Sequence, residues 1–443
     1  MNANSNLERG VPVPRWLAAA ICGVALSLGW GLRGQFGGPR GAMVPGALIA
    51  MALALVARRR FSAAQFWTVA AAGAIGFSIG AEDTYMQTVG RITRGDSTLW
   101  CYFGLLLKGG VWGGLGGLFI GSALGSKRYT LMQLLMAFNV ALAISFVGFW
   151  LINEPKLLYF SGGDPSHHVK PKTEVWAGLW CLYLSLLALA ARAGDRSATR
   201  LSLYGALGCG PGFVLGVLAF ATGQAHFGEA TRSWMDWWKV AECGFGLIGG
   251  LVMGWGWWGM EQEPPLPEPA RPLPTPSPVT MIVLTLDLLL LFYVIDSTDY
   301  VVGWVGAAPF AFVAPALILL VLRSPLLQLL FGVTVPIVLT AWNMQAYWLN
   351  EQHLMPRWIS VAGLMALSAL AAAATRRWQG SPTALFLLTA WSCVAVSWLK
   401  MGIPPMGEMG VYVCVQGLFT VMAAWLTMML RPKSSPTPIP VSA

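Results

Sequence analysis

The chain has 443 residues, of which 56% are hydrophobic and only 11% are charged, and its formal net charge is +9. Soluble globular domains carry about 25% charged residues. A mean hydropathy of +0.62 over the whole chain therefore excludes a soluble core with one anchor and predicts many membrane spans. The positive charge is typical of the Lys and Arg that flank membrane helices, and we expect no nucleic-acid partner.

Apolar stretches of roughly 20 residues, long enough to cross a bilayer as helices, recur along the chain. We expect an all-α polytopic membrane protein with about 14 transmembrane helices. The predicted spans are 14–32, 41–58, 62–82, 99–124, 130–152, 174–193, 200–222, 234–259, 278–296, 301–322, 325–342, 358–375, 384–402 and 408–430. Clusters of Lys and Arg follow the even-numbered spans, which predicts that both termini are cytoplasmic. We expect the bacterial plasma (inner) membrane.

The loop before the second span reads GWGLRGQFGGPRGAM over residues 29–43. Its glycines free backbone N–H groups, and the following helix begins with its positive end toward the loop. Arg33 and Arg40 add forked donors that fit a carboxylate or a phosphate, and Gln35 lies between them. The pattern favours an anion site at the outer mouth; the alternative is a turn whose arginines reach lipid headgroups.

The third span ends in the segment AEDTYMQ. It places Glu82, Asp83, Tyr85 and Gln87 close together in an outer loop. Adjacent carboxylates suit a cation site or acid–base chemistry. Because a helix C-terminus disfavours acids, we favour a functional role, with substrate binding by all four residues, over a hydrogen-bonded helix end.

Short sequence matches at offsets of 133 to 136 residues indicate an internal duplication. The matched pairs are LALVAR at 53–58 with LALAAR at 187–192, GFSIG at 76–80 with GFVLG at 212–216, and WGGLGGLFIG at 112–121 with FGLIGGLVMG at 245–254. They predict two tandem parallel four-helix repeats within spans one to eight. Fainter similarity extends the pattern to a third repeat and a half repeat, in the order 4+4+4+2.

Three ionisable residues lie within predicted spans: Lys108, Glu242 and Asp287. A charge at bilayer depth costs at least about 2.5 kcal/mol and usually has a partner. Lys108 and Glu242 occupy nearly equivalent places in the two repeats, so we expect them to pair, either as a substrate or coupling site or as a structural pin. Asp287 is a second coupling candidate, with a capped structural acid as the alternative.

A proline-rich stretch at residues 261–279 divides the chain. It predicts a cytoplasmic linker between a membrane domain at 1–260 and a second membrane domain of six helices at 280–430, followed by a disordered tail at 431–443. Asn343 and Gln345 are the expected polar binding residues of the third repeat. All seven cysteines lie in apolar stretches, so we expect neither disulfides nor a metal site, and no cofactor.

Most polar residues of the predicted loops fall on the outer side, which favours a site that faces outward. The first hypothesis is a transporter of an anionic small molecule or a lipid-linked substrate, bound near Arg33, Arg40 and Lys108, with Glu242 or Asp287 coupling an ion. The alternative is a membrane-embedded transferase or hydrolase acting on a lipid-linked phosphate or glycan, with acid–base candidates Glu82, Asp83, His226 and His353. A non-catalytic scaffold subunit is the third hypothesis. The oligomeric state is not predicted.

Overall fold

In the computed structural model the described residues are 13–33, 38–57, 61, 63–83, 85–96, 98–125, 129–162, 173–260, 382–399 and 409–430. Within these ranges the regular structure is helical, without a strand. The helices are α1 (Arg15–Arg33), α2 (Gly38–Val56), α3 (Ala63–Gly80), α4 (Met86–Thr93), α5 (Thr98–Leu124), α6 (Leu131–Gly148) with the π-helical turn η1 (Phe149–Asn153), α7 (Trp176–Arg192), α8 (Arg196–Thr231), α9 (Trp237–Met260), α16 (Pro382–Leu399) and α17 (Met409–Leu430).

Six of the described helical stretches are long and apolar enough to cross a membrane, which indicates an integral membrane protein. They lie in α1, α5, α6 with η1, α8, α9 and α17, and shorter apolar helices occur in α2, α3, α7 and α16. Helices thus occupy the first eight and the last two predicted spans. The linker at 261–279 and the spans predicted between 278 and 375 lie outside the described residues, so the total of about 14 spans stays a prediction.

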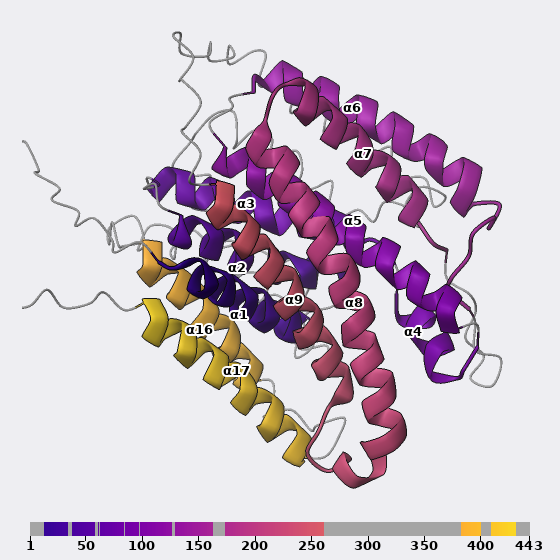
Figure 1. Ribbon diagram of the computed structural model, residues 1–443, viewed down its shortest axis with the longest axis vertical. Helices are drawn as coiled ribbons and strands as arrows, with labels where there is room; N and C mark the ends of the chain where they lie inside the picture. The colour runs from indigo at the N-terminus through magenta and orange to yellow at the C-terminus, as the bar shows by residue number, and fades with distance from the viewer. Residues whose placement is uncertain are drawn as a thin grey trace, which may run out of the picture.

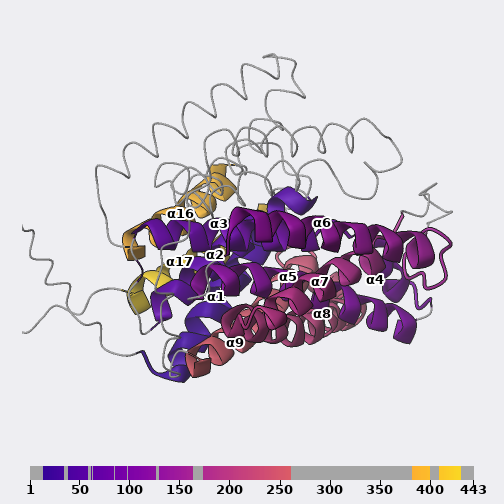
Figure 2. The same ribbon diagram turned by 90° about the horizontal axis from the view of Figure 1, so that it is seen from above.

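The centre of the bundle is made by α1, α5, α8 and α9. The most extensive pairings are α5 with α8, α1 with α9 and α8 with α9, and α3 packs between α2 and α5. Figure 1 shows α16 and α17 along α1 at one edge, with α6 and α7 at the opposite edge, and in Figure 2 α16 and α17 again lie at one end of the bundle.

Close helix crossings depend on glycine. At the crossing of α5 with α8, a Cβ on Gly113 would overlap the carbonyl oxygen of Gly205, and a Cβ on Gly205 would overlap that of Gly113. Small residues let membrane helices approach this closely and gain dispersion contacts without a hydrophobic driving force. The glycine-rich stretches of α5 and α9 are therefore packing surfaces of the central bundle.

The segment between α3 and α4 is not a simple surface loop. After α3 ends at Gly80, the chain turns, and Ala81, Asp83 and Tyr85 are buried before α4 begins. We call the described residues 81–83 and 85 the inward turn. Ala81 and Glu82 still donate to backbone carbonyls of α3, whereas Asp83 has left the helix. Irregular backbone in a membrane protein is tolerated where it is buried in protein or lines a cavity. The inward turn brings two candidate side chains, Asp83 and Tyr85, into the protein.

Candidate functional site

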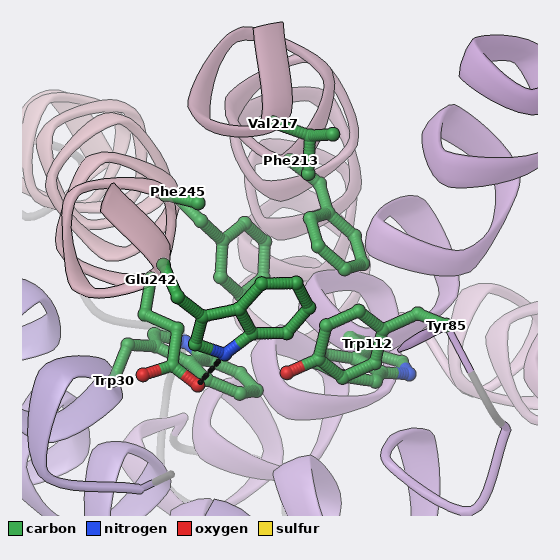
Figure 3. A pocket seen from close by; sticks show the side chains of 9 residues that line it. Trp30, Tyr85, Trp112, Phe213, Val217, Glu242 and Phe245 are labelled. Atoms are coloured by element: carbon green, nitrogen blue, oxygen red, sulfur yellow. Dashed lines mark hydrogen bonds between the residues drawn. The ribbon is translucent and has the colours of Figure 1, made fainter. Parts of the chain in front are cut away.

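Six aromatic side chains surround a small cavity at the end of the bundle where α1 ends and α9 begins (Figure 3). The cavity, which we call the aromatic cavity, measures about 10 Å³, close to the room that one water molecule needs. Its lining residues are Trp30, Tyr85, Trp112, Phe213, Val217, Trp238, Ala241, Glu242 and Phe245. They come from α1, α5, α8, α9 and the inward turn, so the site exists only in the folded bundle.

The aromatic rings hold one another in fixed orientations. Trp30 and Trp112 are stacked with ring centroids 4.9 Å apart, and Tyr85 is stacked on Trp238 at 5.8 Å. Phe245 meets Trp30 edge-on at 4.6 Å. Stacked and edge-on pairs are the favoured aromatic geometries and add about 0.5–1.5 kcal/mol each beyond area burial. The walls of the cavity are therefore preorganised.

Arg33, the last residue of α1, is a buried cation that contacts three of the aromatic residues of the cavity. Its side chain donates a 2.6 Å hydrogen bond to the hydroxyl of Tyr85. The guanidinium carbon lies 5.5 Å from the ring centroid of Trp30, 5.2 Å from that of Tyr85 and 5.7 Å from that of Trp112. The residue is only 8% exposed. Among the described residues, no carboxylate lies within ion-pair distance of Arg33.

Three buried N–H donors around the cavity lack a hydrogen-bond partner in the described part of the chain. They are Nε of Arg33 and the indole nitrogens of Trp30 and Trp112. A buried donor without a partner costs about 1–3 kcal/mol. Donors left open at a cavity are suited to a ligand that brings acceptor oxygens, and the neighbouring guanidinium favours one with negative charge.

Glu242 forms the opposite wall of the aromatic cavity (Figure 3). Its carboxylate accepts hydrogen bonds from the indole of Trp238, at 3.2 Å, and from the ammonium of Lys239. The charge of Glu242 is therefore balanced by Lys239 rather than by Arg33.

A second group of polar side chains lies beside the cavity and is completely buried. Lys108 Nζ of α5 is 2.7 Å from Oε1 of Glu174 and 3.3 Å from Oδ2 of Asp83, and it donates to the hydroxyl of Thr88 at 3.1 Å. We call Lys108, Asp83, Glu174 and Thr88 the buried ion cluster. The side chains of the three charged residues are 0% exposed in these ion pairs. Burial of this many charges requires mutual pairing.

The structure brings several of the predicted site residues together. Tyr85 and Glu242 line the aromatic cavity, Arg33 is hydrogen-bonded to Tyr85, and Asp83 and Lys108 meet in the buried ion cluster. Instead of pairing with each other, Lys108 and Glu242 each have other ion-pair partners, namely Asp83 and Glu174 for the first and Lys239 for the second.

The remaining predicted residues are not shown in either group, or they lie outside the described residues. Glu82 and Gln87 are half-buried, and His226 is exposed on α8. Arg40 lies in the first turn of α2. Gln35, Asp287, Asn343, Gln345 and His353 lie outside the described residues, and their predicted roles stay predictions.

Sequence reasoning missed Glu174 and the cavity tryptophans. Glu174 was one acid in a polar outer loop, and only its place directly before an apolar stretch could have drawn attention to it. Trp238 resembled the interfacial aromatic residues that many membrane helices carry at their ends. Trp30 and Trp112 offered no signal beyond their proximity to Arg33 and Lys108 in sequence.

No family model, curated protein or solved structure matches the chain. The functional argument therefore depends on the chemistry of the site and not on relatives.

Proposed function

We propose that the chain is an integral membrane transporter that binds an anionic small molecule, or the anionic group of a lipid-linked substrate, in the aromatic cavity. The observation that supports this most strongly is Arg33. Within the described residues its guanidinium is buried without a carboxylate partner, which is costly, and Nε of Arg33 and the indole nitrogens of Trp30 and Trp112 lack hydrogen-bond partners there. An anion with acceptor oxygens would offset the cost of the buried positive charge and the cost of the N–H donors that lack partners.

The place of the cavity in the predicted duplication supports transport. Trp112 and Phe245 occupy matched positions of the two predicted repeats. Both line the cavity, and their ring centroids are 5.9 Å apart. Their glycine contacts also correspond, since a Cβ on Gly80 would meet Trp112 and one on Gly216 would meet Phe245. Substrate sites of transporters with internal repeats lie at the interface between the repeats.

The small volume of the cavity fits a closed conformation of such a transporter. Binding a solute requires the walls to separate, and the inward turn is the element suited to move, because it joins α3 to α4 without continuous helix. Transporters commonly build their sites from interrupted helices. By the positive-inside argument the end of α1 faces the extracytoplasmic side of the membrane, which we propose to be the bacterial inner membrane, with both termini cytoplasmic.

Replacing Arg33 with Met tests the anion site. The variant keeps an apolar side chain of similar length but removes the charge and all donors. Loss of one partner of a buried charged contact costs about 2 kcal/mol or more, so we expect anion affinity to fall at least about 30-fold. The measurements are native mass spectrometry of the purified protein and thermal stabilisation by inorganic phosphate and by succinate.

Arg15→Met is the matched control, because Arg15 begins the same helix and also lies over a tryptophan ring, 4.1 Å from the centroid of Trp255. A bound anion retained by the wild type and by the Arg15 variant, but not by the Arg33 variant, supports the proposal. A phosphate-bearing lipid would identify a lipid-linked substrate, and a water-soluble anion a small solute. Equal stabilisation of all three proteins by phosphate and succinate contradicts the site.

A further inference from the structure

We propose that the buried ion cluster is a proton-binding site in which Asp83 takes up one proton, and that this proton controls the inward turn and with it the aromatic cavity. The inference rests on the proposed transport function, for which it supplies the coupling ion. It assigns coupling to a place different from Glu242 and Asp287, the two residues that the sequence favoured.

The charges of the cluster do not balance when every group is ionised. Lys108 provides one positive charge, whereas Asp83 and Glu174 provide two negative charges, and the three side chains are 0% exposed. An excess charge in a buried site is strongly unfavourable, and such a group takes up a proton instead. One bound proton makes the cluster neutral.

The hydrogen bonds decide which carboxylate takes the proton. Glu174 accepts from the backbone N–H of Phe160, from the backbone N–H and hydroxyl of Ser161, and from Lys108 at 2.7 Å. These donors fill both carboxylate oxygens of Glu174 and leave little room there for a proton. Asp83 accepts the N–H of Val175 at 2.9 Å, but its other oxygen, 3.3 Å from Lys108, has no hydrogen-bond partner in the part of the chain that the structure describes.

The electrostatic surroundings of Asp83 agree with this assignment. Asp83 belongs to the inward turn and lies outside the helices. Burial raises the pKa of its carboxyl to about 6, Lys108 on α5 opposes that rise, and Glu174, which precedes α7, adds to it. On α4 the neighbouring group is the neutral hydroxyl of Thr88, bound to Lys108. Asp83 is therefore ionised above this pKa and protonated below it.

The cluster and the cavity share two structural elements. Asp83 and Tyr85 are two residues apart in the inward turn; the first faces Lys108 and Val175, and the second faces Arg33 and Trp112. Lys108 and Trp112 are separated by one turn of α5, about 6 Å along the helix axis. A change of charge in the buried ion cluster can therefore move residues of the aromatic cavity through the inward turn and α5.

Protonation has a defined chemical effect. A proton from water forms an O–H bond on the Asp83 carboxylate, whose negative charge disappears, while Lys108 keeps Glu174 and Thr88 as partners. Because burial raises the pKa of Asp83, its carboxyl binds the proton more tightly while the inward turn is buried, so protonation holds the turn in place. Loss of the proton restores the excess buried charge and favours movement of the turn away from α5. Because Tyr85 is the hydrogen-bond partner of Arg33, this movement releases the guanidinium for an anion.

Infrared difference spectroscopy during a pH titration tests the proton site without any substrate. Between about pH 8 and about pH 5 we expect the wild type to gain the C=O band of one protonated buried carboxyl. The band is absent in Asp83→Asn and unchanged in the control Asp96→Asn, whose carboxylate is 53% exposed. In Glu174→Gln the charges of the cluster balance without a proton, so the titration moves to lower pH.

Hydrogen exchange of the peptide that spans the inward turn and α4 measures the movement. After correction for intrinsic rates, we expect exchange to decrease several-fold on acidification in the wild type and to be slow at both pH values in Asp83→Asn, whose side chain carries no charge. A wild type without the carboxyl band, or with pH-independent exchange of this peptide, overturns the proposal even if the Asp83 variant does not fold. A titrating Asp83 together with no anion binding at Arg33 would contradict the proposed transport function alone.

Discussion

Replacing Lys108 with Met is expected to reduce the free energy of unfolding by about 3–5 kcal/mol, the largest effect of any single side chain in the buried ion cluster. The methionine fits the space of the lysine stem, so the loss arises from charge and not from a void. Asp83 and Glu174 would face each other with 0% exposed side chains and without a counterion, and Thr88 would lose its bond to the ammonium.

Rescue by a second substitution separates this explanation from general damage to α5. The double variant Lys108→Met, Glu174→Gln removes one stranded charge, and we expect it to recover a large part of the loss. Residues in one ion-pair network deviate from additivity by about 0.5–3 kcal/mol. The measurement is thermal unfolding in nanodiscs, with Lys156→Met, an exposed lysine, as the neutral control. A Lys108 variant as stable as the Lys156 variant would show that the cluster does not hold ionised carboxylates.

The sequence predicted the helical class and the positions of ten described helices because membrane helices are defined by length and hydropathy, which are local properties. The same reasoning located Asp83, Tyr85, Lys108 and Glu242, since a charge among apolar residues is conspicuous. Local patterns could not predict which charged side chains pair with one another. Glu174 reaches Lys108 only because the chain after η1 folds back over α5, and no local pattern encodes that return.

The inward turn is the clearest case of this limit. Glu82 and Asp83 were expected in an outer loop, and the structure buries Asp83 while leaving Glu82 half-buried. The chain leaves the helix at this point, and the neighbours Glu82 and Asp83 lie in two different environments. Asp83 turns inward because its partners are Lys108 and the backbone N–H of Val175, just before α7. Both partners are distant from Asp83 in sequence.

The packing of α5 on α8 gives the second large effect, expected for Gly113→Ala. The new Cβ would overlap the carbonyl oxygen and carbon of Gly205, which belong to backbone and cannot rotate away. The two helices must therefore separate at their most extensive contact. Overpacking of this kind costs about 1–3 kcal/mol and sometimes more. We expect a lower thermal unfolding temperature and, because Trp112 adjoins Gly113, weaker anion binding at the aromatic cavity.

Gly244→Ala is the matched control within α9. The nearest atom to its new Cβ is the Cα of Gly216 at 3.6 Å, an ordinary contact, and alanine favours a helix over glycine by about 1 kcal/mol. This variant should be as stable as the wild type or more so. The double variant Gly113→Ala, Gly205→Ala adds a further test. Because the first substitution already separates α5 from α8, the second should cost less than it does alone. Strictly additive losses would mean that the two glycines do not share one helix crossing.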